Sequence, residues 1–431
     1  MSVICGCNAG LFREALHEVY IPRIQRGDAY FAANILGARG ALLLVLVHFF
    51  EHGRWGSPVE TGIGEQSLSA GDQLFILMQA GLYLTATRGP AAPEMRICYE
   101  LAEPLCYSLN RPLLLYVTLM GQWRYSFNTA KLTATMQNAE RVYSFAQQQN
   151  NPTLMMGACT ALTLTRYFLG DFDSSRRYVM RALQIWRSGR VQSPVEEVDV
   201  MAVTCLCFEA LSDWHLGKTV SCHAIVTEAI SLAKKLNDMH GLAVALYWAA
   251  QLYPSDRQPS EVERLTSELI ELSTRQNFPH WLAWGTVLRG WARNASGNTT
   301  EGLSLIEDGI EDYRGNGSIL DLPRLLSLKA EALHLADRTV EALEAIKEAE
   351  KVVEISEAHW WDAELHRLRG VFFTAIGADA AQIEASFCEA IRIAKEQKSV
   401  SLEKRAEGTY AEYRRQKAGG SGGRGFRLPL C

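Results

Sequence analysis

The chain has 431 residues, of which 48% are hydrophobic and 21% charged, and it carries a formal net charge of −5 at pH 7. This composition is ordinary for a folded protein, so it excludes a disordered chain and a membrane-embedded class. The weakly acidic balance lacks the basic footprint that nucleic-acid-binding proteins share. We therefore expect neither a nucleic acid nor a membrane as the main partner.

The ten cysteines are scattered, with close pairs only at Cys5/Cys7 and Cys205/Cys207 and no CxxC motif. This usage is typical of a reduced, cytoplasmic protein rather than of a disulfide framework or a zinc ribbon. The most apolar run, 'ALLLVLVHFF' at 41–50, is half the length of about 20 residues that a membrane span needs. The first residues, 'MSVICGCNAG', lack the charged segment and long apolar core of a secretory signal.

The first segment of the chain, 'GLFREAL' at 10–16, has the form of a turn followed by a helix. A helix that precedes Gly10 has room for only nine residues, whereas a repeat array normally starts with a complete capping unit. We therefore expect residues 1–75 to hold divergent or incomplete N-terminal repeats, and the chain to be the remnant of a longer polypeptide.

The next segment, 'HFFEH' at 48–52, matches the H-x-x-E-H pattern of one class of zinc peptidases. On a continuous helix His48 and His52 would lie on one face and could hold zinc, with Glu51 as the general base. The alternative is a plain helix end, where histidine is favoured by the carbonyl dipole. No third ligand is identifiable, so the zinc hydrolase is kept only as a remote alternative.

Turn signals then recur at a fixed step along the rest of the chain. In 'YFLGDFDSSRRYVMRALQIW' at 167–186, Gly170 ends one helix and Asp171 caps the next. The same pattern places turns about 40 residues apart, near 90 and 130 and at Gly170, Gly217, Arg257, Gly297, Asp337 and near Gly377. The one irregular step, of 47 residues between Gly170 and Gly217, coincides with a polar stretch at 188–199 that predicts a longer loop.

Small residues follow the same period. The small residues before the turns are spaced by 40 residues: Ala210, Ala250, Gly290, Ala330 and Gly370. Other small residues lie five and twelve positions after a turn: Ser175/Ala182, Cys222/Ala229, Gly302/Gly309 and Ala342/Ala349. Small side chains at these positions let paired helices approach closely. This pattern resembles the tetratricopeptide repeat, lengthened by about six residues over its usual 34.

The predicted fold is therefore all-α: a tetratricopeptide-like, right-handed superhelical solenoid of about nine helix pairs, with about 40 residues per pair. The array should occupy residues 76–416, followed by a disordered Gly-rich tail at 417–431. The alternative is an unrelated helical bundle with chance periodicity.

Motifs for catalysis are weak. 'HLGKTV' at 215–220 contains the Gly-Lys-Thr of a phosphate-binding loop, but Ser212 stands where the first glycine is required and a helix precedes it. The other histidines lack metal-ligand spacing, and the acidic residues of 'IEDGIED' read as a solvated helix face. We therefore expect no enzymatic activity and no cofactor.

The aromatic residues suggest a recognition surface. Trp281 and Trp361 occupy equivalent places two periods apart, as do Arg289 and Arg369, and Trp284 adds to the density. The first helices of such pairs line the concave face of a solenoid, where partners bind. These five residues are the candidate contacts to a partner or ligand, with the arginines suited to an acidic group. The alternative is that the tryptophans are packing between repeats.

Four segments resemble a particular family: 'LYLTATRGPAAPE' at 82–94, 'FPHWLAWGTVLRGWARNASGNTTEGLSLIEDGI' at 278–310, 'AELHRLRGVFF' at 363–373 and 'AKEQKSVSLEKRA' at 394–406. They are similar to the C-terminal region of bacterial signalling proteins that carry a class III adenylate/guanylate cyclase domain, an AAA-like predicted ATPase domain and a tetratricopeptide array. This chain has no Walker motif and no cyclase metal-binding aspartates, so no catalytic residue carries over.

The resemblance implies a sensor or docking module of a cyclase/ATPase-type regulator. Its partner would be a protein or small-molecule signal, or the cyclase and ATPase domains of a related polypeptide. An independent tetratricopeptide scaffold is the alternative function.

Overall fold

The computed structural model describes residues 2–27, 31–34, 36, 38–55, 67–189, 198–252 and 258–418. Within these ranges the chain forms helices and turns and no β-strand, so the all-α prediction is confirmed. The chain divides into two compact units, residues 1–129 with 137–145, and residues 130–136 with 146–431. Each unit is described by itself.

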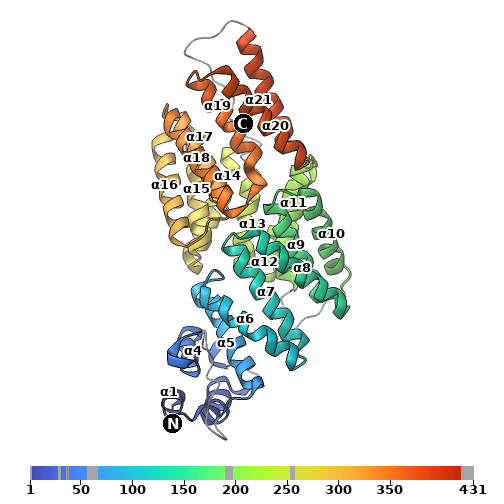
Figure 1. Ribbon diagram of the computed structural model, residues 1–431. Coiled ribbons are helices and arrows are strands. Elements are labelled where there is room, and N and C mark those ends of the chain that lie inside the picture. The colour runs from blue at the N-terminus through green and yellow to red at the C-terminus, as the bar shows by residue number, and fades with distance from the viewer. Residues whose placement is uncertain are drawn as a thin grey trace. The chain divides into compact units, whose positions relative to one another are not determined.

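The first unit opens with short and irregular helices up to Gly53 and continues with three regular ones (Figure 1). The short elements are α1 (Val3–Asn8), α2 (Phe12–Glu14), the π-helix η1 (Ala15–Gln25), α3 (Phe31–Asn34), α4 (Arg39–Leu46) and the 3₁₀ turns η3 (Val47–Phe49) and η4 (Glu51–Gly53). The regular helices are α5 (Ala70–Arg88), α6 (Pro93–Ser108) and α7 (Pro112–Asn128), and α8 (Leu132–Gln149) is shared with the second unit. Ser69 and Asp72 form a capping box that starts α5.

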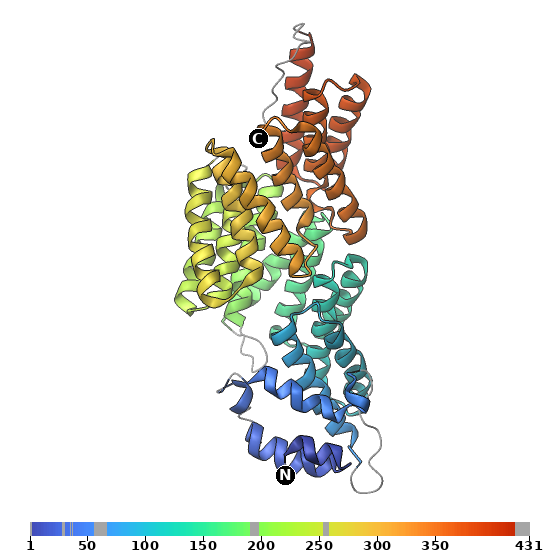
Figure 2. The ribbon, with the colours of Figure 1, turned by 90° about the vertical axis from the view of Figure 1, so that its left-hand side faces the viewer.

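The second unit consists of regular antiparallel helices that stand side by side in both ribbon views (Figure 2). They are α9 (Pro152–Phe168), α10 (Phe172–Arg187), α11 (Val198–His215), α12 (Thr219–Leu236), α13 (Met239–Leu252), α14 (Pro259–Gln276), α15 (Pro279–Ala295), α16 (Thr299–Gly315), α17 (Leu322–Leu335), α18 (Thr339–Ser356), the 3₁₀ turn η7 (His359–Trp361), α19 (Asp362–Ala375), α20 (Ala380–Glu396) and α21 (Val400–Ala418).

Regular pairs thus run from α5/α6 to α19/α20. In the part of the chain that the structure describes they number eight rather than about nine, because the helices before Ala70 are too short and irregular to form a further pair. The helix α21 includes residues 417 and 418, the first two of the predicted tail, and residues 419–431 lie outside the described part of the chain.

A residue with positive φ follows nearly every helix of the array. Most of these residues come about 20 apart: Gly89, Asn110, Ala130, Asn150, Gly170, Gly189, Gly217, Asn237, Asn277, Gly297, Gly317, Asp337, Glu357, Gly377 and Lys398. The predicted turns near 90, 130 and 377 and at four further positions are therefore confirmed. The predicted turn at Arg257 and most of the long loop at 188–199 lie outside the described residues.

The small residues allow close helix packing, as their spacing predicts. A Cβ atom on Gly290 of α15 would lie 2.6 Å from the carbonyl oxygen of Gly302 in α16, and one on Gly309 would lie 2.9 Å from the carbonyl oxygen of Ala283. Neither distance leaves room for a methyl group. The paired helices α15 and α16 are therefore in backbone contact.

The C-terminal pairs of the second unit return to its first pairs. Nδ1 of His215, at the end of α11, lies 2.8 Å from the hydroxyl oxygen of Ser399, and the Ser401 hydroxyl donates to the carbonyl oxygen of Trp214. The side chain of Gln397 covers the turn at Gly170. These contacts join residues more than 180 positions apart, so the first helices of distant pairs face one another across a common interior.

Candidate ligand-binding site

The interior of the second unit is filled by an aromatic cluster from first helices. The ring centroid of Tyr167, in α9, lies 5.1 Å from that of Phe208 in α11 and 6.3 Å from that of Trp248 in α13. The ring of Trp360, in η7, lies 5.5 Å from the Tyr167 ring. Edge-to-face contacts of this kind stabilise a core beyond simple burial. The cluster thus joins the start and the end of the unit.

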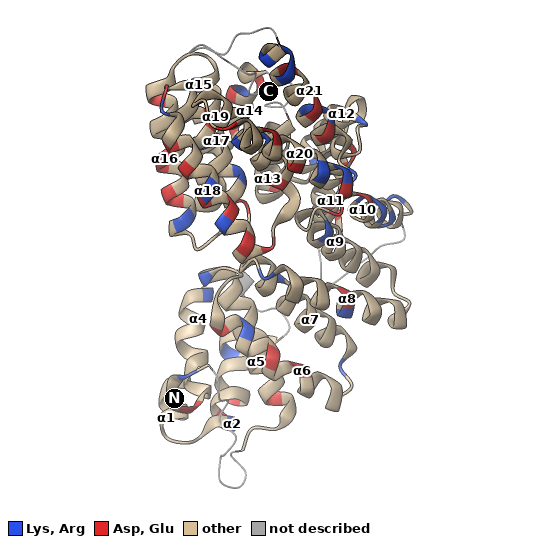
Figure 3. Cartoon of the chain, turned by 45° about the horizontal axis from the view of Figure 1, so that its top comes forward, with Lys and Arg blue, Asp and Glu red and all other residues tan. Residues whose placement is uncertain are grey.

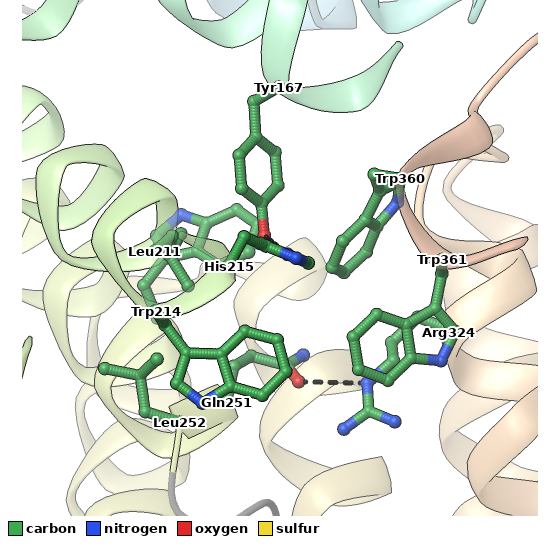
Figure 4. Close-up of a pocket in the computed structure, with 10 residues that line it drawn as sticks. Tyr167, Leu211, Trp214, His215, Gln251, Leu252, Arg324, Trp360 and Trp361 are labelled. Carbon is green, nitrogen blue, oxygen red and sulfur yellow. Dashed lines mark hydrogen bonds between the residues drawn. The ribbon is translucent and has the colours of Figure 1, made fainter. Parts of the chain in front are cut away.

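A pocket opens beside this cluster, and we call it the Arg324 pocket (Figure 4). Its lining residues come from five elements, α9, α11, α13, α17 and η7: Tyr167, Leu211, Trp214, His215, Trp248, Gln251, Leu252, Arg324, Trp360 and Trp361. The pocket encloses about 290 Å³ including its opening, but only about 20 Å³ is free for a water-sized group. In this conformation it holds roughly one water molecule.

Arg324 is 3% exposed and has weak partners. Its Nε donates to Oε1 of Gln251 at 3.4 Å, the dashed line of Figure 4, and its Nη1 donates to the Ser327 hydroxyl at 3.5 Å. The guanidinium also lies over the Trp361 ring, at 4.1 Å from the ring centroid. No carboxylate of the described residues lies within 4.0 Å of it. Burial lowers the pKa of Arg324, although Glu331 and Glu364 oppose this effect from a distance.

A second buried guanidinium, that of Arg367, provides a contrast. Its Nε and Nη2 donate to the two carboxylate oxygens of Glu364 at 2.9 and 2.7 Å, and both side chains are 1% exposed. Arg405 adds a third bond to Glu364 at 2.8 Å. Burial opposes ionisation of Glu364, but the two arginines outweigh it and keep its pKa below the ordinary value. The fold thus gives Arg367 direct carboxylate partners, whereas no described carboxylate lies within 4.0 Å of Arg324.

Two further polar groups close to this region lack partners in the described part of the chain. Oδ1 of Asp321 and Nε1 of Trp360 are buried and accept or donate no hydrogen bond there. Burial raises the pKa of Asp321 to about 8, so its carboxyl group is mainly protonated at neutral pH. The backbone N–H of Asp321 donates to the Tyr313 hydroxyl at 3.2 Å. Buried polar groups are normally satisfied, so these exceptions mark the region as a candidate site.

The three tryptophans singled out from the sequence lie in different surroundings. Trp284 is fully buried, with its ring 4.5 Å from that of Tyr247. Trp281 is half-buried beside the same tyrosine, at 5.5 Å. Trp361 is 4% exposed and lines the Arg324 pocket. Only Trp361 of the three therefore reaches the pocket.

The two predicted arginines are each paired with a glutamate of the preceding second helix. Nε of Arg289 donates to Oε1 of Glu263 at 3.2 Å, and Nη1 of Arg369 donates to Oε1 of Glu350 at 2.6 Å. Both arginines are about one third exposed or less. The structure thus keeps them partly accessible, but it does not bring them together with Trp361.

The continuous helix on which the zinc prediction depended is interrupted at Phe50. His48 lies in the 3₁₀ turn η3 and Glu51 begins the separate turn η4, because Phe50 between them is extended, with φ −112° and ψ 143°. Residues 48–52 therefore do not form one continuous helix, and the expectation that they do was wrong. Among the residues that the structure describes, no three His, Cys, Asp or Glu side chains gather as metal ligands.

The remaining motifs have structural roles. Gly217, with φ 79°, forms the turn between α11 and α12, and Nζ of Lys218 pairs with Asp213 at 3.6 Å. The helix α11 precedes this turn where a phosphate-binding loop requires a strand. Cys205 and Cys207 are fully buried free thiols, and burial raises the pKa of Cys205 to about 12.

Sequence reasoning missed most of the pocket. Arg324 and Gln251 were not singled out, nor were the aromatic residues Tyr167 and Trp248. One signal was available, because Asp321 and Arg324 are the charged residues of an otherwise mainly apolar stretch, 'ILDLPRLLSL' at 319–328. A charge in such a position usually has a specific partner.

Charge on the surface is mixed in sign. Figure 3 shows basic and acidic residues interleaved along α18, whereas α16 carries mainly acidic ones. Several pair between neighbouring helices, including Lys329 with Glu307 at 3.1 Å and Arg314 with Glu348. No described helix combines the length and apolar character needed to cross a membrane.

Comparisons with solved structures identify proteins of similar fold. The chain is similar to a solved Rap protein complexed with competence and sporulation factor, with a TM-score of 0.61 and 13% identity over 84% of this chain and 98% of that one. Weaker likenesses are to apo RapI (TM-score 0.46, 15% identity, 67% and 99% covered) and to a signal-transduction ATPase with a tetratricopeptide repeat sensor from Pyrococcus horikoshii (TM-score 0.40, 11% identity, 89% and 62% covered). The tetratricopeptide-like solenoid fold is thus confirmed.

No family model matches the sequence. A curated relative, an uncharacterized protein of Rhizobium meliloti (strain 1021), is 24% identical over 350 residues, which are 79% of this chain. The chain spans about one third of the length of that relative, since the match covers 33% of it.

Proposed function

We propose that this chain is a non-enzymatic recognition module that binds a partner or ligand on the layer formed by the first helices of its second unit. The observation that carries this proposal is the Arg324 pocket, where a buried guanidinium that no described carboxylate pairs with directly faces an incompletely filled aromatic interior. A layer that served only as packing would gain stability from an apolar side chain at that position.

The solenoid fold supports a recognition role in general terms. Stacked helix pairs provide an extended inner surface, and side chains from several pairs can contact one partner there. The similar Rap structure is a complex with competence and sporulation factor. Trp281, Trp284, Arg289, Trp361 and Arg369 remain the proposed contacts, together with the pocket residues.

We further propose that the module belongs to a cyclase/ATPase-type signalling regulator. The sequence resemblance described above supports this context, and so does the much greater length of the Rhizobium meliloti relative. The module would then dock on the remainder of such a polypeptide and restrain or release its catalytic domains.

A binding experiment tests the proposal. The probe is the polypeptide that makes up the Rhizobium meliloti relative outside the matched segment, titrated against the immobilised full chain. We expect saturable binding that weakens at least fivefold in Arg289→Gln and Arg369→Gln. Arg392→Gln is the matched control, because Arg392 pairs with Glu389 on the second helix α20 and not on the proposed surface. Absence of binding, or equal loss in the control, would contradict docking through the first helices.

A further inference from the structure

The charge of Arg324 decides which ligands the pocket can accept. A buried guanidinium without a carboxylate carries a large desolvation cost, which a bound anion would offset. Its present partners, the Gln251 amide oxygen and the Ser327 hydroxyl, are neutral and lie at 3.4 and 3.5 Å. Arg367 shows what a satisfied guanidinium looks like in the same unit, with two bonds to Glu364 under 3 Å.

No buried carboxylate of the described residues pairs directly with Arg324, because Glu331 and Glu364 favour its charged form only from beyond 4.0 Å. Glu364 is engaged by Arg367 and Arg405, and Asp321 is mainly protonated at neutral pH because burial raises its pKa to about 8. His215, which also lines the pocket, is kept neutral by burial, which holds its pKa well below the ordinary value. Among the residues that the structure describes, Arg324 is thus the one charged side chain of the lining.

The shape and chemistry of the walls restrict the ligand further. Four indoles and the Tyr167 ring surround the space, with Leu211 and Leu252 closing one side (Figure 4). Aromatic walls favour a flat apolar body that can stack or meet ring edges. They would also suit a cation, but the face of Trp361 is already occupied by the Arg324 guanidinium. A doubly charged phosphate would need a second cation, and the described part of the lining contains none.

We propose that the Arg324 pocket binds a small monoanion, a carboxylate carried on a flat aromatic body, with Arg324 holding the carboxylate and the indoles enclosing the ring. The carboxylate takes the place of the Gln251 amide oxygen on the guanidinium. Because the free space is now only about 20 Å³, entry separates η7 from α13 and widens the pocket. This inference rests on the proposed function, since the ligand occupies the same layer of first helices.

The test uses the full chain and its own tryptophan fluorescence. Benzoate and indole-3-acetate are titrated against their uncharged amides, benzamide and indole-3-acetamide, and a dipeptide ending in a free phenylalanine carboxylate is compared with its C-terminal amide. We expect saturable binding of the acids, at least tenfold tighter than that of the amides. Binding of the dipeptide acid as well would identify a peptide C-terminus as a source of the carboxylate; binding of the free acids alone would identify a small organic acid. Equal or absent binding of acids and amides overturns the proposal.

Two variants locate the site. Arg324→Gln should lose at least tenfold in acid binding, whereas Arg338→Gln, an exposed arginine paired with Glu341, should bind as the wild type does. If Arg324→Gln does not fold, Gln251→Glu decides the matter, because it puts a carboxylate on the guanidinium from within the chain. We expect this variant to melt at a higher temperature and to bind no acid. Unchanged acid binding by Gln251→Glu would place the ligand elsewhere and overturn the assignment.

The outcome is separable from that of the proposed function. Docking of the Rhizobium meliloti polypeptide is measured without any acid present, so its loss and the loss of acid binding are independent results.

Discussion

The indole ring of Trp361 covers the guanidinium of Arg324, with 4.1 Å between the Cζ atom and the ring centroid. The two residues belong to successive repeats, since Arg324 lies in the first turn of α17 and Trp361 ends the 3₁₀ turn that precedes α19. The indole Nε1 of Trp361 also donates to the Ser327 hydroxyl at 3.2 Å, and Ser327 in turn accepts from Arg324. A desolvated cation–π contact of this kind contributes about 2 kcal/mol. Trp361 therefore positions the charge that faces the pocket.

Removal of this ring should be costly. We expect Trp361→Ala to lower the free energy of unfolding by about 3–5 kcal/mol, because it leaves a cavity and exposes one face of a buried guanidinium. Urea denaturation measures the change. Trp281→Ala is the control, and it should cost clearly less because Trp281 is only half-buried. Equal losses for the two variants would mean that Trp361 has no special role.

The buried ion pair makes a second prediction. Glu364→Gln should lower the free energy of unfolding by about 3–5 kcal/mol, because it leaves Arg367 and Arg405 with uncompensated charge in the core. Glu341→Gln, which breaks an exposed pair with Arg338, should have no measurable effect. Urea denaturation of both variants at one pH checks this difference, and a Glu364 variant as stable as the wild type contradicts it.

Asp321 should make stability depend on pH. Burial raises the pKa of its carboxyl group from 3.8 to about 8, so between these pH values the folded chain binds more protons than the unfolded one. The contribution of Asp321 to the free energy of unfolding therefore falls as the pH rises from about 4 to about 8, and it is constant above that range.

Asp321→Asn cannot ionise and should escape this loss. We expect the free energy of unfolding of the variant, relative to that of the wild type, to increase by up to a few kcal/mol from pH 5 to pH 9. Urea denaturation of both proteins at each pH measures this difference. A difference between the two proteins that stays constant over this range would show that Asp321 does not titrate as its burial implies.

Two glycines in helices should respond in opposite ways to the same substitution. Gly290→Ala should destabilise the chain by about 1–3 kcal/mol, because the new methyl group would meet the backbone of α16 at 2.6 to 2.9 Å. Gly408→Ala, on α21, should stabilise it by roughly 0.5–1 kcal/mol, because nothing lies within 4 Å and alanine favours a helix. Thermal unfolding measures both changes in stability, a lower melting temperature for Gly290→Ala and a higher one for Gly408→Ala. A neutral Gly290→Ala would mean that α15 and α16 are further apart than described.

Helix pairs, their turns and the small residues between paired helices could be predicted from the sequence alone. These features depend on local backbone conformation and on contacts between neighbouring helices. The 40-residue period of turn residues and small residues is therefore enough to predict them. Gly170, Asp337 and Gly290 were identified in this way, and their conformations and contacts agree with the prediction. The break at Phe50 was not predicted, because a short H-x-x-E-H match says nothing about whether one helix continues through it.

The Arg324 pocket was decided only by the tertiary structure. It forms where Tyr167, Gln251 and Trp360 meet, and their approach depends on the rotation that accumulates over several repeats. The same holds for Arg289 and Arg369, whose glutamate partners on the preceding helix follow from packing rather than from the repeat period. Local sequence determines each hairpin, whereas the small rotation between successive hairpins determines which distant side chains share the interior.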